Sequence, residues 1–109
     1  MKLYIGGAYQ GQEELAKREN PGMPVFPDFH ETIRREAVDC GRDPRAFAEQ
    51  FCLEHPDAVV VSDEVGAGVV PIAAEDRAFR EAVGRALCVV ARNAGEVTRC
   101  VCGIGVRIK

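Results

Sequence analysis

The pattern of apolar and polar positions predicts strands that alternate with helices along the chain. Short apolar runs between turn residues predict strands, and apolar spacings of three and four residues predict helices. The expected strands are 3–5, 25–26, 58–61, 97–102 and 106–108. The expected helices are 11–19, 29–38, 44–54 and 74–93. This alternation is typical of an α/β fold, with a mostly parallel sheet of about five strands flanked by helices.

Particular residues support these boundaries. Asp28 precedes the helix expected over 29–38, and we expect its carboxylate to cap that helix. Asp43 followed by Pro44 is a favourable start for the next helix. The run 58–61 is apolar at every position, which a central parallel strand requires. The long helix carries an amphipathic stripe formed by Phe79, Val83, Ala86, Leu87 and Val90.

Composition narrows the class of protein. A chain of 109 residues suggests one domain, and a net charge of -3 gives no basic excess for binding nucleic acid. The apolar runs are too short to span a membrane, so the expected location is the cytoplasm.

The five cysteines, an odd number, argue against a closed disulfide framework. Cys100 and Cys102 would share one face of a strand. We expect the cysteines to pack as small apolar residues, with a metal or redox role as the minor alternative.

The loop after the first strand has the outline of a phosphate-binding loop. Gly6 and Gly11 fit the frame G-x-x-x-x-G-K-[ST], but Gln12 and Glu13 occupy the lysine and hydroxyl positions. In a parallel sheet, ligands bind beyond the carboxyl ends of the strands, where Asp28, Asp63 and Glu64 also fall. The layout predicts a magnesium-nucleotide site. Its candidate nucleotide-binding residues are Gly6, Gly7, Gly11, Gln12 and Glu13, its candidate metal ligands are Asp28, Asp63 and Glu64, and its candidate catalytic residues are Asp28 and Glu64.

The two histidines add no motif to this layout. His30 and His55 have no partners at a useful spacing in the sequence. We therefore expect both to be surface or partly buried residues without a catalytic role.

Two segments carry a family resemblance. The runs "DEVGAGVVPIAAEDRAFREAVGR" and "GEVTRCVCGIGVRIK" resemble the bifunctional adenosylcobinamide kinase / adenosylcobinamide-phosphate guanylyltransferase family of cobalamin biosynthesis. The resemblance implies a P-loop NTPase-like fold, a truncated domain over 1–109, Mg with ATP or GTP as cofactor if nucleotide binding is retained, and a homo-oligomer. It also implies that Gly66, Gly68, Arg77, Arg80 and Arg85 contact substrate or lie at an interface.

Departures from the family pattern affect its chemistry. Gln12 brings no charge for the terminal phosphates, and Glu13 adds a carboxylate. One unit-charge contact is worth about 4 kcal/mol at roughly 4 Å and an effective dielectric of about 20. The segment that carries the family's guanylyl-accepting histidine is missing, so we expect no guanylyl transfer by that route. Asp63, Leu87, Cys88 and Gly105 also differ from the pattern.

Two hypotheses follow. The first is a relative without guanylyltransferase or kinase activity that binds a nucleotide, a corrinoid or a partner protein as a scaffold or regulator. The alternative is a reduced enzyme that uses magnesium-nucleotide to phosphorylate cobinamide or a similar small alcohol. A thiol or metal function of Cys100 and Cys102 is a third and weaker possibility.

Overall fold

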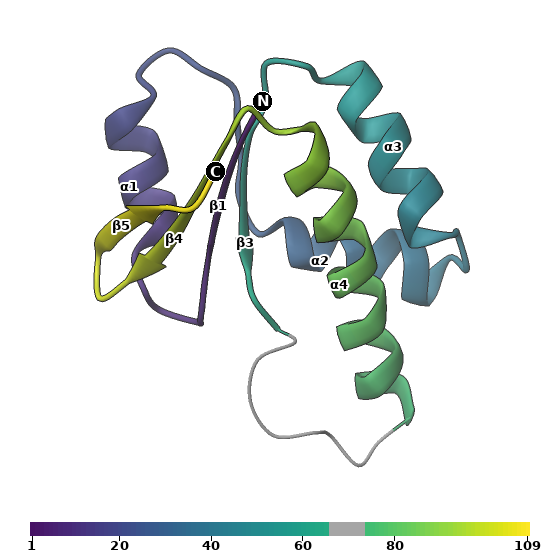
Figure 1. Ribbon diagram of the computed structural model, residues 1–109. Helices are drawn as coiled ribbons and strands as arrows, with labels where there is room; N and C mark the ends of the chain where they lie inside the picture. The colour runs from purple at the N-terminus through teal and green to yellow at the C-terminus, as the bar shows by residue number, and fades with distance from the viewer. Residues whose placement is uncertain (66–73) are drawn as a thin grey trace.

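The computed structural model describes residues 1–65 and 74–109, which form a five-stranded sheet with helices on both faces (Figure 1). The strands are β1 (Lys2–Gly6), β2 (Val25–Phe26), β3 (Val59–Asp63), β4 (Glu96–Val101) and β5 (Ile104–Arg107). The helices are α1 (Gln12–Glu19), α2 (Phe29–Ile33), α3 (Pro44–Glu54) and α4 (Ala74–Asn93). A π-helical segment, η1 (Arg34–Asp39), continues α2. The expected α/β fold with a mostly parallel, five-stranded sheet is confirmed.

The order of the strands places β1 near the centre of the sheet. The order is β2-β3-β1-β4-β5, in which β4 and β5 form the antiparallel pair and the other neighbours are parallel. The chain runs from β1 to the edge strand β2, returns to β3, and then crosses beyond β1 to reach β4. The carboxyl ends of β1, β2 and β3 therefore meet at one edge, where α/β proteins bind ligands.

Alternation along the strands divides the core between the two faces of the sheet. Leu3 and Val60 pack in the larger cluster with Phe29, Phe51 and α4. Tyr4 and Val61 point the other way, into the smaller cluster with α1. Helix α1 thus covers one face of the sheet, while α2, α3 and α4 cover part of the other (Figure 1).

Several local predictions need correction. Asp28 occupies the N-cap position of α2, but its backbone is left-handed, with a φ of 54°, and its side chain makes no capping bond. The helix expected over 29–38 is α-helical only to Ile33. Cys102 does not share a strand face with Cys100, because β4 ends at Val101 and Cys102 lies in the following turn with a φ of 50°. Asp43, by contrast, caps α3 as predicted, accepting a hydrogen bond from the Ala46 amide.

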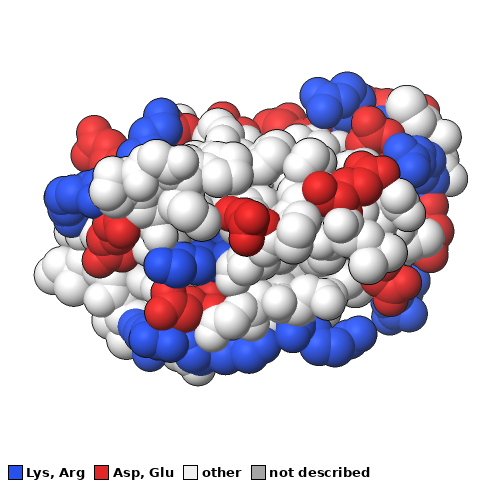
Figure 2. Space-filling view, turned by 90° about the horizontal axis from the view of Figure 1, so that it is seen from above, with Lys and Arg blue, Asp and Glu red and all other residues white. Residues whose placement is uncertain are grey.

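The outer surface mixes charges of both signs. Figure 2 looks onto the side where the parallel strands begin and shows Lys and Arg interspersed with Asp and Glu. In the part of the chain that the structure describes, no helix is both long and apolar enough to cross a bilayer.

Candidate functional site

A cleft of about 390 Å³ opens at the carboxyl ends of β1, β2 and β3. Its volume is within the range of small-molecule sites. The amide, imidazole and carboxylate side chains that line it are Gln12, Glu13, Glu14, Asp28, His30 and Asp63. The structure therefore brings three of the five predicted loop residues, Gly11, Gln12 and Glu13, together with two of the three predicted acidic residues.

Close packing explains the glycines of the loop. A Cβ on Gly6 would lie 2.6 Å from the carbonyl oxygen of Cys100, so only glycine fits where β1 passes β4. Gly11 precedes α1 with a φ of 83°, a conformation that glycine adopts without strain. Gln10 tethers the loop to the turn after β4, because its Oε1 accepts a hydrogen bond from the Cys102 amide at 2.6 Å and its carbonyl oxygen accepts one from Gly103.

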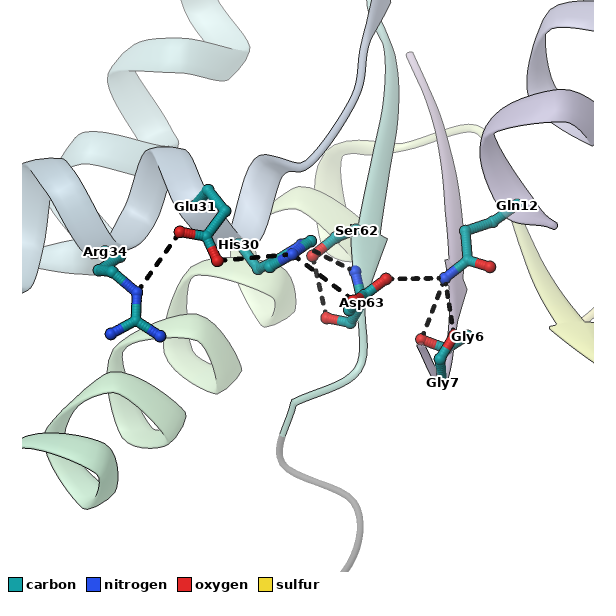
Figure 3. A network of polar contacts seen from close by, with 8 residues as sticks. All are labelled: Gly6, Gly7, Gln12, His30, Glu31, Arg34, Ser62 and Asp63. Atoms are coloured by element: carbon teal, nitrogen blue, oxygen red, sulfur yellow. Dashed lines mark hydrogen bonds and ion pairs between the residues drawn. The ribbon is translucent and has the colours of Figure 1, made fainter. Parts of the chain in front are cut away.

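Gln12 joins the loop to β3. Its Nε2 lies 3.0 Å from the Gly7 carbonyl oxygen, 3.3 Å from the Gly6 carbonyl oxygen and 3.0 Å from Asp63 Oδ1 (Figure 3). A primary amide has two N–H groups, so three acceptors surround a group that can serve only two of them. Gln12 Oε1 is buried and has no hydrogen-bond donor among the described residues. The surroundings of this side chain suit an ammonium group better than an amide.

His30 is the cleft residue whose role the sequence analysis missed. Its Nδ1 accepts a hydrogen bond from the Asp63 amide at 3.0 Å. Because a backbone N–H can only donate, the imidazole carries its proton on Nε2. That nitrogen lies 3.6 Å from Asp63 Oδ2 and 3.9 Å from Glu31 Oε1, so it faces two carboxylates (Figure 3). The available signal was the position of His30 just beyond β2, at the same edge of the sheet as Asp63.

The polar contacts continue from His30 towards α4. Glu31 forms an ion pair with Arg34 at 3.4 Å, and the Arg34 guanidinium lies 3.7 Å from the centre of the Phe79 ring. A chain of contacts thus connects the long helix with the loop through His30 and Asp63.

The cleft has a strongly acidic lining. Glu13, Glu14, Asp28 and Asp63 contribute four carboxylates, while no Lys or Arg of the described chain lines the cleft. Glu13 turns towards Lys17 on the surface of α1, with 3.1 Å between Oε2 and Nζ. Its carboxylate is therefore engaged in a surface pair with Lys17. A triphosphate without magnesium would therefore meet carboxylates in this cleft and no lysine or arginine of the described residues.

Glu64 does not join the other two predicted metal ligands. It lines a separate, mainly apolar hollow with Leu3, Ile5 and residues of α4, on the opposite face of the sheet from Gln12. Neighbouring residues of a strand point to opposite faces, and this period of two could have separated Asp63 from Glu64 in advance. Within residues 1–65 and 74–109, no three His, Cys, Asp or Glu side chains are grouped to hold a metal ion.

The predicted substrate or interface residues lie away from the cleft or outside the described residues. Arg77, Arg80 and Arg85 belong to α4 and none of them lines the cleft. Arg85 pairs with Glu81 on the same helix. Gly66 and Gly68 lie outside the described residues.

The thiols fall into two groups. Cys100 is buried and Cys52 is half-buried, and burial raises the pKa of both thiols. Cys40, Cys88 and Cys102 are exposed, so the expectation that cysteines serve mainly as packing residues holds for only part of the set. None of the five lines the cleft.

Comparison with protein families identifies the chain's relatives. Residues 29–108 match the family described as cobinamide kinase / cobinamide phosphate guanyltransferase. The chain belongs to this family. Membership connects it with cobalamin biosynthesis, as the sequence resemblance implied. The matched range begins after the loop that carries Gly6 to Glu13, and no curated protein matches the chain.

Proposed function

We propose that this chain is a binding protein of corrinoid metabolism that has lost phosphoryl and guanylyl transfer. The observation that carries the proposal is the acidic lining of the cleft. Polyphosphate sites supply cations and backbone amides to a ligand of high negative charge. Here four carboxylates line the cleft, and an uncharged amide takes the place of the expected lysine.

The preferred ligand carries no phosphate. Cobinamide ends in an aminopropanol hydroxyl and has not yet acquired the phosphate that a kinase would add. Such an arm presents hydrogen-bond donors, and carboxylates accept hydrogen bonds from hydroxyl and amide groups without the repulsion that a phosphate would meet. The proposed role is therefore to hold or deliver a corrinoid before it is phosphorylated.

A reduced kinase is the second candidate. The observation that favours it is that Asp28 and Asp63 line the same cleft as Gly11. Carboxylates are the oxygen ligands that Mg²⁺ prefers, and magnesium could offset part of the negative charge. This candidate requires measurable binding of triphosphate in the presence of magnesium.

Calorimetric titration separates the two candidates. We expect no binding of ATP or GTP with magnesium to the wild type, and binding to a variant that combines Gln12→Lys with Glu13→Ser. The matched control combines Glu49→Ser with Gln50→Lys on the exposed face of α3, which changes the net charge equally but far from the cleft. Cobinamide should bind the wild type, and a change in the visible absorbance of cobinamide should report this binding.

The outcomes are distinct. Submillimolar binding of magnesium-triphosphate by the wild type, together with formation of phosphorylated cobinamide, would establish the kinase and overturn the proposal. Equal triphosphate binding by the loop variant and the α3 control would refute the electrostatic reason given for it. Absence of cobinamide binding would remove the proposed ligand.

A further inference from the structure

Tyr9 lines the cleft together with Asp28 and Asp63, yet its side chain is fully exposed. Its relative exposure is 102%, so the phenol ring lies at the mouth of the cleft and packs against nothing. Within residues 1–65 and 74–109, the structure gives this side chain no hydrogen bond and no ring contact. A single exposed aromatic residue is ordinary on a protein surface, but the backbone of Tyr9 is not ordinary.

Tyr9 has a left-handed backbone, with a φ of 62°. This conformation is unfavourable for a residue with a bulky side chain, whereas glycine and asparagine adopt it more readily. Because the ring is fully exposed, no packing of Tyr9 offsets this strain. The fold by itself would therefore be more stable with glycine or asparagine at position 9, and the tyrosine needs a reason other than folding.

Hydrogen bonds on both sides of Tyr9 hold the loop in this conformation. Before it, the Ala8 carbonyl oxygen accepts a hydrogen bond from Gln10 Nε2 at 3.3 Å. After it, the Gln10 carbonyl oxygen accepts a hydrogen bond from the Gly103 amide at 2.8 Å. Gln10 Oε1 accepts another from the Cys102 amide at 2.6 Å. The turn after β4 thus fixes the loop, and the ring of Tyr9 is presented to solvent before any ligand arrives.

The size of the cleft indicates which part of a corrinoid would meet this ring. A volume of about 390 Å³ suits a small molecule, and a corrin macrocycle with its side chains is larger than such a ligand. If cobinamide binds as proposed above, its aminopropanol arm enters the cleft and its macrocycle remains at the mouth, where Tyr9 lies. An aromatic ring buries a large apolar area when it packs against a broad surface of this kind.

We propose that Tyr9 is a ligand-contacting residue whose ring packs against the macrocycle of a corrinoid. This inference rests on the proposed function and adds to it the contact that distinguishes a macrocyclic ligand from a small free alcohol. Because the loop is already fixed, little conformational freedom is lost when the ring meets the ligand. The left-handed backbone lowers the stability of the chain but keeps the ring in its binding position.

Substitutions of Tyr9 separate ligand contact from a structural role, because the two measured effects have opposite signs. Tyr9→Asn removes the ring and suits the left-handed backbone, so the midpoint of thermal unfolding should rise by roughly 2–4 °C. The affinity for cobinamide, measured by the visible absorbance of cobinamide, should fall about tenfold.

Two controls accompany Tyr9→Asn. Tyr9→Phe keeps the ring and the backbone strain, so its affinity for cobinamide and its midpoint of unfolding should equal those of the wild type. Leu53→Asn removes an exposed apolar side chain from α3, outside the cleft, and should leave the affinity for cobinamide unchanged.

The outcomes distinguish this inference from the proposed function. A wild type that binds no cobinamide would remove both of them. Binding by the wild type that Tyr9→Asn leaves unchanged would overturn only the contact with Tyr9 and would keep the proposed ligand. A loss of affinity together with a lower midpoint of unfolding would indicate a structural role and would also overturn the inference. So would a loss of ATP and magnesium binding in Tyr9→Asn without a loss of cobinamide binding, because the ring would then stack on a nucleobase.

Discussion

Replacing Gln12 by lysine should stabilise the fold, although it introduces a charge at a residue only 5% exposed. Three acceptors surround Nε2, namely the carbonyl oxygens of Gly6 and Gly7 and the Asp63 carboxylate. An ammonium group offers three N–H donors and no acceptor, so it matches these three partners. It also removes the buried and unpartnered Oε1 of Gln12.

The change in the free energy of unfolding expected for Gln12→Lys is the sum of opposing contributions. A buried polar atom without a partner costs about 1–3 kcal/mol, and the substitution recovers this cost. Pairing with Asp63, whose side chain is 31% exposed, adds only about 0–1 kcal/mol because solvent screens the pair. Ordering a lysine side chain costs up to about 2 kcal/mol, and partial desolvation of the charge reduces the gain further. We expect a net stabilisation of about 1 kcal/mol, which corresponds to several degrees in the midpoint of thermal unfolding.

Urea denaturation followed by circular dichroism measures the free energy of unfolding of the variants. Gln12→Met is the control of similar shape, and it should destabilise the fold because it removes the donor to the Gly7 carbonyl oxygen and to Asp63 Oδ1. The Gly6 carbonyl oxygen keeps its hydrogen bond from the Glu64 amide. Combining Gln12→Lys with Asp63→Asn should remove part of the gain. If Gln12→Lys were less stable than the wild type, or no more stable than Gln12→Met, the interpretation of the loop as a lysine site would be refuted.

Four further predictions concern the core and its surface. Gly84 lies within α4 with no atom within 4 Å of a Cβ position, so Gly84→Ala should raise the free energy of unfolding by up to about 1 kcal/mol. Gly6→Ala should lower the free energy of unfolding by about 1–3 kcal/mol, since the added Cβ meets the Cys100 carbonyl oxygen. Urea denaturation measures both glycine variants, and the same change in both would contradict the packing argument. Burial, and then the hydrogen bond to Glu19, raises the pKa of Tyr4 above 10.0, so its contribution to stability is complete below pH 10.0 and is lost as the pH rises through the folded value. In urea titrations, the difference in the free energy of unfolding between the wild type and Tyr4→Phe should therefore shrink above pH 10.0. A difference that grew there would contradict the raised pKa of Tyr4. The Cys100 thiol, buried and with a raised pKa, should react with Ellman's reagent far more slowly than the exposed Cys102; equal rates in single-cysteine variants would rule out the described burial.

The site was only partly predictable because its residues meet through the sheet. Strand ends identified the loop, Asp28 and Asp63 as neighbours, since parallel strands bring their carboxyl ends to one edge. The contact between His30 and the Asp63 amide joins residues 33 positions apart, and no local pattern encodes it. The hydrogen bond from Gln12 Nε2 to Asp63 Oδ1 joins residues 51 positions apart, and it could not be predicted from the sequence either. The separation of Glu64 from Asp63 was predictable, because consecutive residues of an extended segment point to opposite faces of the sheet.

The sequence by itself determined the order and type of the main elements, the family, and the change of charge in the loop. These properties depend on local periodicity and on the identity of single residues, and both can be read from the sequence. The tertiary structure alone decided that Glu14 joins Asp28 and Asp63 in the cleft, that three acceptors surround the Gln12 amide, and that His30 accepts a hydrogen bond from the Asp63 amide. Each of these depends on how strands far apart in the sequence align in the sheet, because backbone pairing between them fixes which side chains meet.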